Sequence, residues 1–463
     1  MSNELSPEEA GRRAQELLAS YEERERSNPH KRPKTNTLDV STVLAHAGVS
    51  GNASSSTTAA SHQESLDNIS MSPALHMSTT FTRPAHGQYA PSDSIYARAD
   101  NPTRLLLERE IAQLECHNPS STSPDFAGSD NTTTAQPVCC AFASGMMAAS
   151  SIILAHSTPL HVLLPHDLYH GVPTVLADVF TRFQVTTHQV DMTNESGIFS
   201  GIPNEGDVIV WIETPSNPKC HVINIQAVRN ALSKTKKEIQ ARTTIVVDST
   251  LAPPVITRPL LLGADIVVHS ATKYLAGHSD ALIGVATTSP WTCKGTEIGA
   301  RLKQVQIAVG GVASPMDCWL TLRGLRTLQV RVERQCKTAQ KIAEFLSQNT
   351  IIQAVHYPGL GSHPQHKAAR HQMKGGYGGV MSLEMKDASW AMALAGALQV
   401  VQRATSLGGT ESLIEHRASI EPPHRRTSPP GLLRLSLGLE DPDDLIADFS
   451  RAIEICKEVF ASD

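Results

Sequence analysis

The sequence of 463 residues lacks the features that mark several large classes of protein. Its longest apolar stretch, residues 391–401, is shorter than the ~18–20 residues of a membrane-spanning helix, so it predicts a buried helix. The net charge is −5, so no basic excess points to a nucleic acid or a membrane surface. Only eight cysteines occur, none in a C-x-x-C pair. That pattern is not a disulfide framework and favours a reducing compartment, the cytoplasm.

Several motifs of nucleotide, hydrolase and metal chemistry are also missing. No G-x-G-x-x-G follows a predicted strand, and neither G-x-x-x-x-G-K-[ST] nor G-x-S-x-G occurs. His363, His366 and His371 lie close together, but they have no carboxylate or thiol at the spacing of metal ligands. We therefore expect no metal there, only a polar loop that leads into a helix.

The composition is that of a folded protein with more than one domain. Hydrophobic residues make up 40% and charged residues 18%, which excludes a disordered chain and a coiled coil. The N-terminus has no apolar stretch typical of a secretory signal and is too acidic for a mitochondrial transit peptide. The basic patch 30–34 is either a nuclear signal or, as we favour, part of a solvated tail.

The chain divides into four parts by the character of its sequence. Residues 1–36 carry mixed charges and predict a flexible arm. Residues 37–95 hold a Ser/Thr/Ala-rich insertion at 50–61. Residues 96–324 contain a second polar insertion at 118–137 and the recurring apolar runs of a large domain. Residues 325–463 form a smaller domain with long helical patterns.

From residue 138 on, short apolar runs recur at the spacing of a strand plus a helix. Several are apolar at successive positions, which is typical of strands buried on both faces of a parallel sheet. Helical patterns lie between them, including 225–235 and a helix that opens at Gly145. We therefore predict an α/β large domain with a mainly parallel sheet. The predicted strands are 138–144, 159–165, 207–213, 243–249 and 265–270.

After residue 325 the pattern predicts a smaller α+β domain. It begins with one long amphipathic helix and ends with another, and strands and a helix alternate between them. The predicted helices are 325–348, 389–401 and 442–460, and the predicted strands are 375–385 and 432–437.

The informative chemistry lies at the ends of two predicted strands. Asp248 ends one of them, and the next ends in Ser270, Thr272 and Lys273. Because parallel strands end at the same edge of a sheet, these groups should converge on one crevice. Taken singly, a strand-end aspartate is more often a turn residue and a lysine is usually solvated. Their order and spacing together favour a site.

Pyridoxal phosphate (PLP) needs this set of groups. A lysine binds its aldehyde, a carboxylate keeps the ring nitrogen protonated, and hydroxyls and backbone N–H groups hold its phosphate. Gly145 and Met146 follow a strand and open a helix, where free N–H groups and the helix dipole favour an anion. The residues therefore predict a PLP site.

Over residues 42–460 the chain resembles the trans-sulfuration family of PLP enzymes, which comprises cystathionine γ-synthases, cystathionine γ- and β-lyases and methionine γ-lyases. Matching segments follow in the family's order. They are YARADNPTR (96–104), ASGMMAA (143–149), ETPSNP (213–218), VVDST (246–250), RPLLLGADIVVHSATKYLAGHSD (258–280), RGLRTLQVRVERQC (323–336), SLGGTESL (406–413) and RLSLGLEDPDDL (434–445). The resemblance implies the fold-type-I, aspartate-aminotransferase-like architecture. It also implies a homotetramer of two dimers that share active sites, with the segment 37–95 at a subunit contact.

The resemblance also implies roles around the cofactor ring. Lys273 resembles the Schiff-base lysine, which moves protons between carbons of the substrate. Asp248 resembles the partner of the pyridine nitrogen, and Asn217 the residue that bonds the ring hydroxyl. Tyr169 resembles the tyrosine that stacks on the ring and can transfer a proton.

Further roles concern the phosphate and the substrate. A phosphate cradle is implied for Gly145, Met146, Ser270 and Thr272. Tyr96 and Arg98 resemble a pair that reaches the phosphate of a neighbouring subunit, although packing or an intrachain ion pair would also account for them. Ser406 and Arg434 resemble the pair that holds the substrate's α-carboxylate, because a guanidinium binds a carboxylate through two parallel bonds.

Three departures from the family pattern lie around the implied substrate entrance. Thr405 stands where cystathionine γ-lyases and γ-synthases usually have a glutamate that could meet the distal amino group of cystathionine. Residues 170–173 replace a Gly-Gly-Thr segment, and 415–430 replace a Met-Thr-His-Ala-like stretch. The last of these segments contains Arg417, Arg425 and Arg426. The departures leave the amino-acid substrate open and the cofactor unchanged.

Three functions remain open. The first is a PLP-dependent C–S lyase that acts on cystathionine or a related sulfur amino acid by β- or γ-elimination. The second is a cystathionine γ-synthase that joins cysteine to an O-acylhomoserine. The third is a non-catalytic paralogue, against which the presence of Lys273, Asp248, Tyr169 and Arg434 argues.

Overall fold

The computed structural model of the chain describes residues 40–45, 47, 71–83, 85, 87, 94–118, 136–194, 197–421 and 426–460. All of these except Asn118 belong to one compact unit, formed by residues 40–117 and 123–463. The predicted arm 1–36 with its basic patch, the insertion 50–61 and most of the insertion 118–137 lie outside the described residues. The predicted division into four parts is not tested and stays a proposal.

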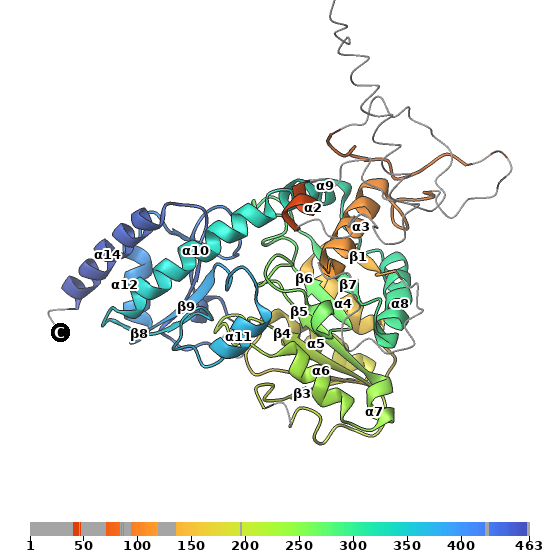
Figure 1. Ribbon diagram of the computed structural model, residues 1–463, viewed down its shortest axis with the longest axis horizontal. Helices are drawn as coiled ribbons and strands as arrows, with labels where there is room; N and C mark the ends of the chain where they lie inside the picture. The colour runs from red at the N-terminus through yellow and green to blue at the C-terminus, as the bar shows by residue number, and fades with distance from the viewer. Residues whose placement is uncertain are drawn as a thin grey trace, which may run out of the picture. The chain divides into compact units, whose positions relative to one another are not determined.

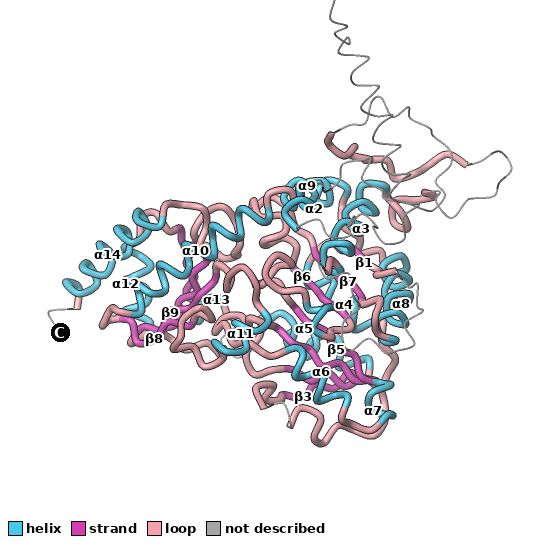
Figure 2. The backbone as a smooth tube through the Cα atoms, viewed as in Figure 1, coloured by secondary structure: helices cyan, strands magenta, loops and turns pink. Residues whose placement is uncertain are grey.

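A seven-stranded sheet forms the large half of this unit (Figures 1 and 2). Its strand order is β1-β7-β6-β5-β4-β2-β3. Neighbouring strands from β3 to β6 are parallel, whereas β7 runs antiparallel to both β6 and β1. The strands are β1 Cys139–Phe142, β2 Leu160–Leu164, β3 Val185–Gln189, β4 Asp207–Glu213, β5 Thr243–Asp248, β6 Ile266–His269 and β7 Gly284–Thr288. The prediction of a mainly parallel sheet is confirmed.

Burial on both faces explains why the central strands read as unbroken apolar runs. In β4, Ile209 and Trp211 pack into the core on the side of α4 and α5. Val208 and Val210 pack into the opposite core, against α6. Each face of the sheet is therefore covered by helices, as a parallel sheet requires. The helices around it are α2 Val40–Ala45, α3 Pro102–Cys116, α4 Gly145–Leu154, α5 Gly171–Asp178, α6 Ile225–Ser233, α7 Lys237–Arg242, α8 Cys293–Val309 and α9 Pro315–Leu325.

A five-stranded sheet with the order β10-β11-β12-β9-β8 forms the smaller half. Its strands are β8 Ile352–His356, β9 Val380–Met385, β10 Gln402–Arg403, β11 Leu413–His416 and β12 Leu432–Ser436. Its helices are α10 Leu328–Ser347, α11 His366–Gln372, α12 Ala388–Ala397, α13 Arg417–Ile420 and α14 Pro442–Val459. Residues of α10, α12 and α14 share one apolar core with β8, β9 and β12, so the predicted α+β organisation is confirmed.

Two predicted elements are shorter than their sequence patterns indicated. The strand predicted from 375 begins only at Val380, because Gly375, Gly376 and Gly378 adopt positive φ angles that no strand allows. The helix predicted to reach 401 ends at Ala397. Beyond it, the N–H groups of residues 399–401 donate to the buried carboxylate of Asp448 on α14 instead of continuing the helix.

In the described part of the chain, no helix has both the length and the apolar character needed to cross a membrane.

The core of the smaller half gives a test of its packing. Phe449 on α14 is fully buried, whereas Ile455 on the same helix is 40% exposed. We expect Phe449→Ala to lower the free energy of unfolding by about 3–5 kcal/mol, because it leaves a cavity in the apolar core that α14 shares with α10 and α12. Ile455→Ala should change it by less than about 0.5 kcal/mol. Urea denaturation followed by circular dichroism measures both, and equal effects would contradict this packing.

Candidate active site

A cavity of about 420 Å³ opens at the carboxyl-terminal ends of β4, β5 and β6 and is closed on its far side by the smaller sheet. Ten of the twelve predicted site residues line it: Gly145, Met146, Tyr169, Asn217, Asp248, Ser270, Thr272, Lys273, Ser406 and Arg434. Tyr96 and Arg98 do not. The convergence of strand ends that the sequence predicts is therefore present.

Asp248 is the last residue of β5, and Thr250 donates the hydrogen bonds to its carboxylate. Its Oδ1 accepts hydrogen bonds from the N–H of Thr250, at 2.9 Å, and from its hydroxyl, at 2.6 Å. The same hydroxyl oxygen accepts from the N–H of Ser270 at 2.9 Å, which fixes the loop after β6 to the end of β5. Burial raises the pKa of Asp248, and the bonds from Thr250 oppose that rise. A cationic ring nitrogen placed beside it would favour the ionised form.

Lys273 lies in the turn after β6 and points to the smaller sheet. Its Nζ donates to Ser406 Oγ at 2.7 Å. Burial, together with the positive charge of Arg434, lowers the pKa of Lys273 to about 8, although Glu415 opposes this. Ser406 itself has a φ of 87°, a left-handed conformation that is strained for a residue other than glycine. Such strain is typical of functional sites, and here it places the hydroxyl that receives the lysine.

Glu213, which the sequence analysis did not single out, supports two site residues at once. It ends β4 directly beside Asp248 and is buried. Its carboxylate accepts from the N–H of Tyr169 at 2.9 Å and from the N–H of Asn217 at 2.7 Å. Burial, and then the nearby Asp248, raise the pKa of Glu213. Its position at the last residue of a predicted strand was the signal that could have identified it.

The first turn of α4 provides a cradle for an anion. Ser144 caps the helix by accepting from the N–H of Met147 at 3.1 Å, and the first N–H groups of a helix have no partner within it. A Cβ on Gly145 would lie 3.0 Å from the Cβ of Ser270, so a side chain there would fill the cradle. Thr272 lines the cavity, but its hydroxyl donates to the carbonyl of Ile283 at 3.1 Å and so holds the turn.

These groups fit pyridoxal phosphate. They combine a carboxylate for the ring nitrogen, a lysine with a lowered pKa, an aromatic side chain and an N-terminal helix turn for the phosphate. The described residues contain no group of three or more His, Cys, Asp or Glu side chains that could hold a metal ion. Of the histidines weighed as ligands, His363 lies in a loop and His366 begins α11.

Arg434 reaches the cavity from the middle of β12, and its guanidinium is 5% exposed. One nitrogen donates to the carbonyl of Ser406 at 2.9 Å and forms an ion pair with Glu415 at the same distance. The other donates to Asn217 Oδ1 at 3.3 Å and so joins the two sheets. Burial lowers the pKa of Arg434 to about 10, and Glu415 opposes the change.

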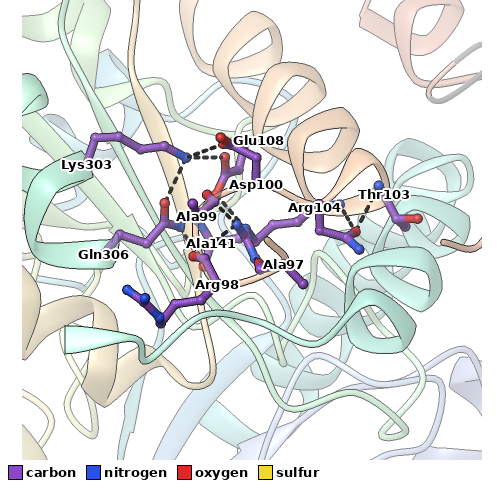
Figure 3. A network of polar contacts seen from close by, with 11 residues as sticks. Ala97, Arg98, Ala99, Asp100, Thr103, Arg104, Glu108, Ala141, Lys303 and Gln306 are labelled. Carbon is purple, nitrogen blue, oxygen red and sulfur yellow. Dashed lines mark hydrogen bonds and ion pairs between the residues drawn. The ribbon is translucent and has the colours of Figure 1, made fainter. Parts of the chain in front are cut away.

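Tyr96 and Arg98 lie on a loop that Arg104 holds by hydrogen bonds, and neither of them lines the cavity. Figure 3 shows Arg104 reaching this loop, where it donates to the carbonyls of Ala97 and Ala99, each at 2.7 Å. Tyr96 is 48% exposed, with the Arg98 guanidinium 5.9 Å from its ring centre. Arg98 donates to the carbonyl of Ile307 at 2.6 Å. Within one chain, therefore, this pair does not complete the phosphate cradle.

Comparison with known proteins places these features in a family. Residues 55–454 match the Cys/Met metabolism PLP-dependent enzymes. Cystathionine β-lyase MetC of Bacillus subtilis (strain 168) is 37% identical over 390 residues, which cover 82% of this chain and 91% of the relative. Cystathionine γ-lyase of the same organism is 33% identical over 421 residues, covering 89% and 98%.

A solved structure supports the same assignment. Cystathionine γ-synthase from Xanthomonas oryzae pv. oryzae, crystallised with aminoacrylate and cysteine, superposes with a TM-score of 0.76 at 29% identity. The match covers 91% of this chain and all of that one. The predicted fold-type-I architecture is thus confirmed. The chain belongs to the Cys/Met metabolism PLP-dependent enzymes, which carry out trans-sulfuration reactions with pyridoxal phosphate as their cofactor.

Proposed function

We propose that this enzyme is a carbon–sulfur lyase that cleaves cystathionine or a related sulfur amino acid by β- or γ-elimination. The observation that carries the proposal is the meeting of Lys273, Asp248 and Arg434 in one cavity. A base, a carboxylate for the ring nitrogen and a cation for the substrate's carboxylate are the groups that such a reaction needs. Two of the relatives reported above are named as lyases of cystathionine.

In the proposed mechanism each residue acts at a defined atom. When bound, pyridoxal phosphate supplies a ring that accepts the negative charge left by removal of the substrate's α-proton. With the cofactor bound, Asp248 would hold a proton at the ring nitrogen, and Asn217 would bond the ring hydroxyl. Lys273 Nζ would remove the α-proton, for which a pKa of about 8 suits it near neutral pH. Tyr169 would provide an aromatic side chain against the ring.

The substrate is held and shielded by the smaller sheet and the cavity wall. Arg434 binds the α-carboxylate, and Ser406 lies beside it. Gly145, Met146 and Ser270 hold the phosphate through the first turn of α4 and the loop after β6. Apolar side chains also line the cavity, and they suit the aliphatic and thioether part of the substrate. These are Val172, Leu251, Leu282, Leu407 and Ile420.

We also propose that two copies complete each site and that two such pairs form a tetramer. Tyr96 and Arg98 do not line their own cavity and Tyr96 is half-exposed, which supports a role for the pair at the phosphate of a neighbouring copy. Large apolar side chains are exposed on the segments next to them, as expected of a contact surface. They include Met71, Leu75, Met77 and Ile95.

For location we propose the cytoplasm. All eight cysteines of the sequence lie within the described residues, and none of them forms a disulfide. The basic patch 30–34 lies outside the described residues, and neither the structure nor the comparisons support a nuclear pool.

Product analysis with L-cystathionine tests the proposed reaction. We expect pyruvate if the bond at Cβ breaks and 2-oxobutyrate if the bond at Cγ breaks. Lys273→Ala should lower turnover by at least about 10³-fold while leaving the circular dichroism unchanged, because it removes the base but no core contact. The exposed Lys457→Ala serves as control.

Other products would decide between the remaining functions. Cystathionine formed from an O-acylhomoserine and cysteine, with no keto acid from cystathionine, would establish a γ-synthase instead. A purified protein without borohydride-reducible visible absorbance, and without product from cystathionine, cysteine, methionine or the homoserine esters, would instead support a non-catalytic paralogue. Full activity of Lys273→Ala would refute the assigned site.

The lowered pKa of Lys273 gives a second test in the cofactor-free protein. Only the neutral amine acylates, so labelling of Lys273 by acetic anhydride should rise with pH and be half-maximal near pH 8. Arg434→Gln should move this midpoint upward, since a nearby cation no longer opposes protonation. Arg434→Lys keeps the charge and should leave the midpoint near 8. Mass spectrometry of the labelled peptide measures the midpoint, and one near 10 in the unchanged protein would contradict this description.

Shared sites predict complementation between two defective variants. Arg98→Ala and Lys273→Ala lose different parts of the site, so a mixed pair of subunits contains one site with neither change. After co-refolding of equal amounts, we expect up to about one site in four to regain activity. As a control, the two folded variants are mixed without being unfolded and refolded together. Failure to regain activity, although the two variants form mixed oligomers, would show that Arg98 serves its own chain.

A further inference from the structure

A row of four buried charges leads away from the cavity along the segment that departs from the family pattern. Arg434 on β12, Glu415 on β11, and Arg417 and Glu421 at the two ends of α13 have exposures of 5%, 6%, 2% and 4%. Charged side chains are rarely buried unless they are paired, so each needs its neighbour. Three of the four line the cavity: Arg434, Glu415 and Arg417.

One carboxylate oxygen of Glu415 is shared by two guanidinium groups. Oε2 lies 2.9 Å from Nη2 of Arg434 and 2.6 Å from Nη1 of Arg417. Arg417 is closer, and its other terminal nitrogen lies 3.6 Å from Glu421. Glu421 in turn accepts from the N–H groups of Thr427 and Ser428, at 2.9 and 3.0 Å. Glu421, at the end of the row remote from the cavity, is therefore held by backbone hydrogen bonds, and Glu415 contacts both arginines.

The bond between Arg417 and Glu415 is made by one terminal nitrogen alone. Arg417 Nε is buried and has no hydrogen-bond partner among the described residues. Its N–H lies on the same side of the guanidinium as Nη2, away from Nη1, so it does not face the carboxylate that Nη1 holds. The second oxygen of Glu415, Oε1, is also buried without a partner among the described residues. The bond to Nη1 is therefore the contact that can keep Glu415 paired when another anion takes up Arg434.

Binding of a substrate carboxylate to Arg434 would bring two negative charges together unless a second cation, Arg417, holds Glu415. A substrate carboxylate that approaches Arg434 meets Glu415 already bound there, and two carboxylates repel one another in a cavity of low polarity. If Arg434 were the only cation beside Glu415, the substrate's carboxylate would have to displace Glu415 from Arg434. Glu415 would then be a buried charge without a partner, which is strongly unfavourable.

We propose that Arg417 is a positioning residue for substrate binding: it keeps Glu415 paired when the α-carboxylate of the amino-acid substrate binds Arg434. The inference rests on the proposed function, in which Arg434 binds that carboxylate. It assigns a role to a residue through which this chain departs from its family's pattern. Arg417 touches neither the cofactor nor the reacting atoms in this mechanism, and acts through Glu415.

Binding of two unreactive ligands to the holoenzyme tests this inference. L-alanine carries the α-carboxylate but no leaving group, and L-alaninamide lacks the negative charge. Titration of each, followed by the change in cofactor absorbance, gives a Kd. Arg417→Met should raise the Kd of alanine at least about 10-fold and that of alaninamide less than about 2-fold. The exposed Arg334→Met, which breaks a surface ion pair, should change neither.

A second variant separates positioning from a merely structural role. The double variant Arg417→Met with Glu415→Gln removes the competing carboxylate together with its partner. We expect it to bind alanine within about 3-fold of the unchanged enzyme, whereas a structural role predicts that the double variant binds no better than Arg417→Met. If Arg417→Met fails to fold, Arg417→Lys carries the test, because it keeps the charge but lacks the two terminal nitrogens that separately contact Glu415 and Glu421. It should weaken alanine binding and spare alaninamide.

Every other outcome overturns the inference. Equal loss of both ligands would make Arg417 a structural residue. Unchanged alanine binding with weaker cystathionine binding would place Arg417 at the distal end of the substrate. The variant Arg434→Met distinguishes failure of the proposed carboxylate site from failure of the inference about Arg417. If that variant binds alanine normally, the proposed carboxylate site is wrong. If it loses alanine while Arg417→Met does not, only the inference about Arg417 is wrong.

Discussion

The structure of the site depends on burying carboxylates at the ends of two adjacent parallel strands. Asp248 and Glu213 are register partners on β5 and β4, so their side chains cannot avoid one another. A buried carboxylate is tolerated only where hydrogen bonds replace its water. Thr250 provides them for Asp248, and the N–H groups of Tyr169 and Asn217 provide them for Glu213. The need to satisfy these two charges therefore fixes the loops that carry the ring-contacting residues.

The same principle joins the two sheets. Arg434 comes from β12, yet its guanidinium contacts Asn217, which Glu213 holds in place, and the carbonyl of Ser406, whose hydroxyl receives Lys273. Any change in the position of the smaller sheet would therefore alter the surroundings of Lys273. In this arrangement the lowered pKa of Lys273 depends on both halves, because the lysine belongs to the large half and the positive charge of Arg434 comes from the smaller one.

A feature of the structure could be predicted from the sequence when its physical cause lies within a few neighbouring residues. The central strands are readable because burial on both faces leaves an unbroken apolar run, and Lys273 is readable because it directly follows such a run. The antiparallel strand β7 was missed because its short sequence, GVATT, mixes apolar residues with threonines. Glu213 was missed because a strand-end carboxylate usually belongs to a turn. The partners of Arg417 are set by the pairing of β11 with β12, which no local pattern reveals.

The arrangement of charges also explains why the reaction type is harder to read than the cofactor. The groups proposed to hold the cofactor are tied to strand ends and to a helix start, where substitution would leave a buried polar group without a partner. Thr405, His170 and Arg417 line the same cavity and lie where the substrate is proposed to enter, at the rim. One fold can therefore keep its proton chemistry while the rim changes. In this chain the rim holds a second buried arginine, Arg417, which shares Glu415 with Arg434, so in the proposed mechanism it acts on carboxylate binding and not on the proton at Lys273.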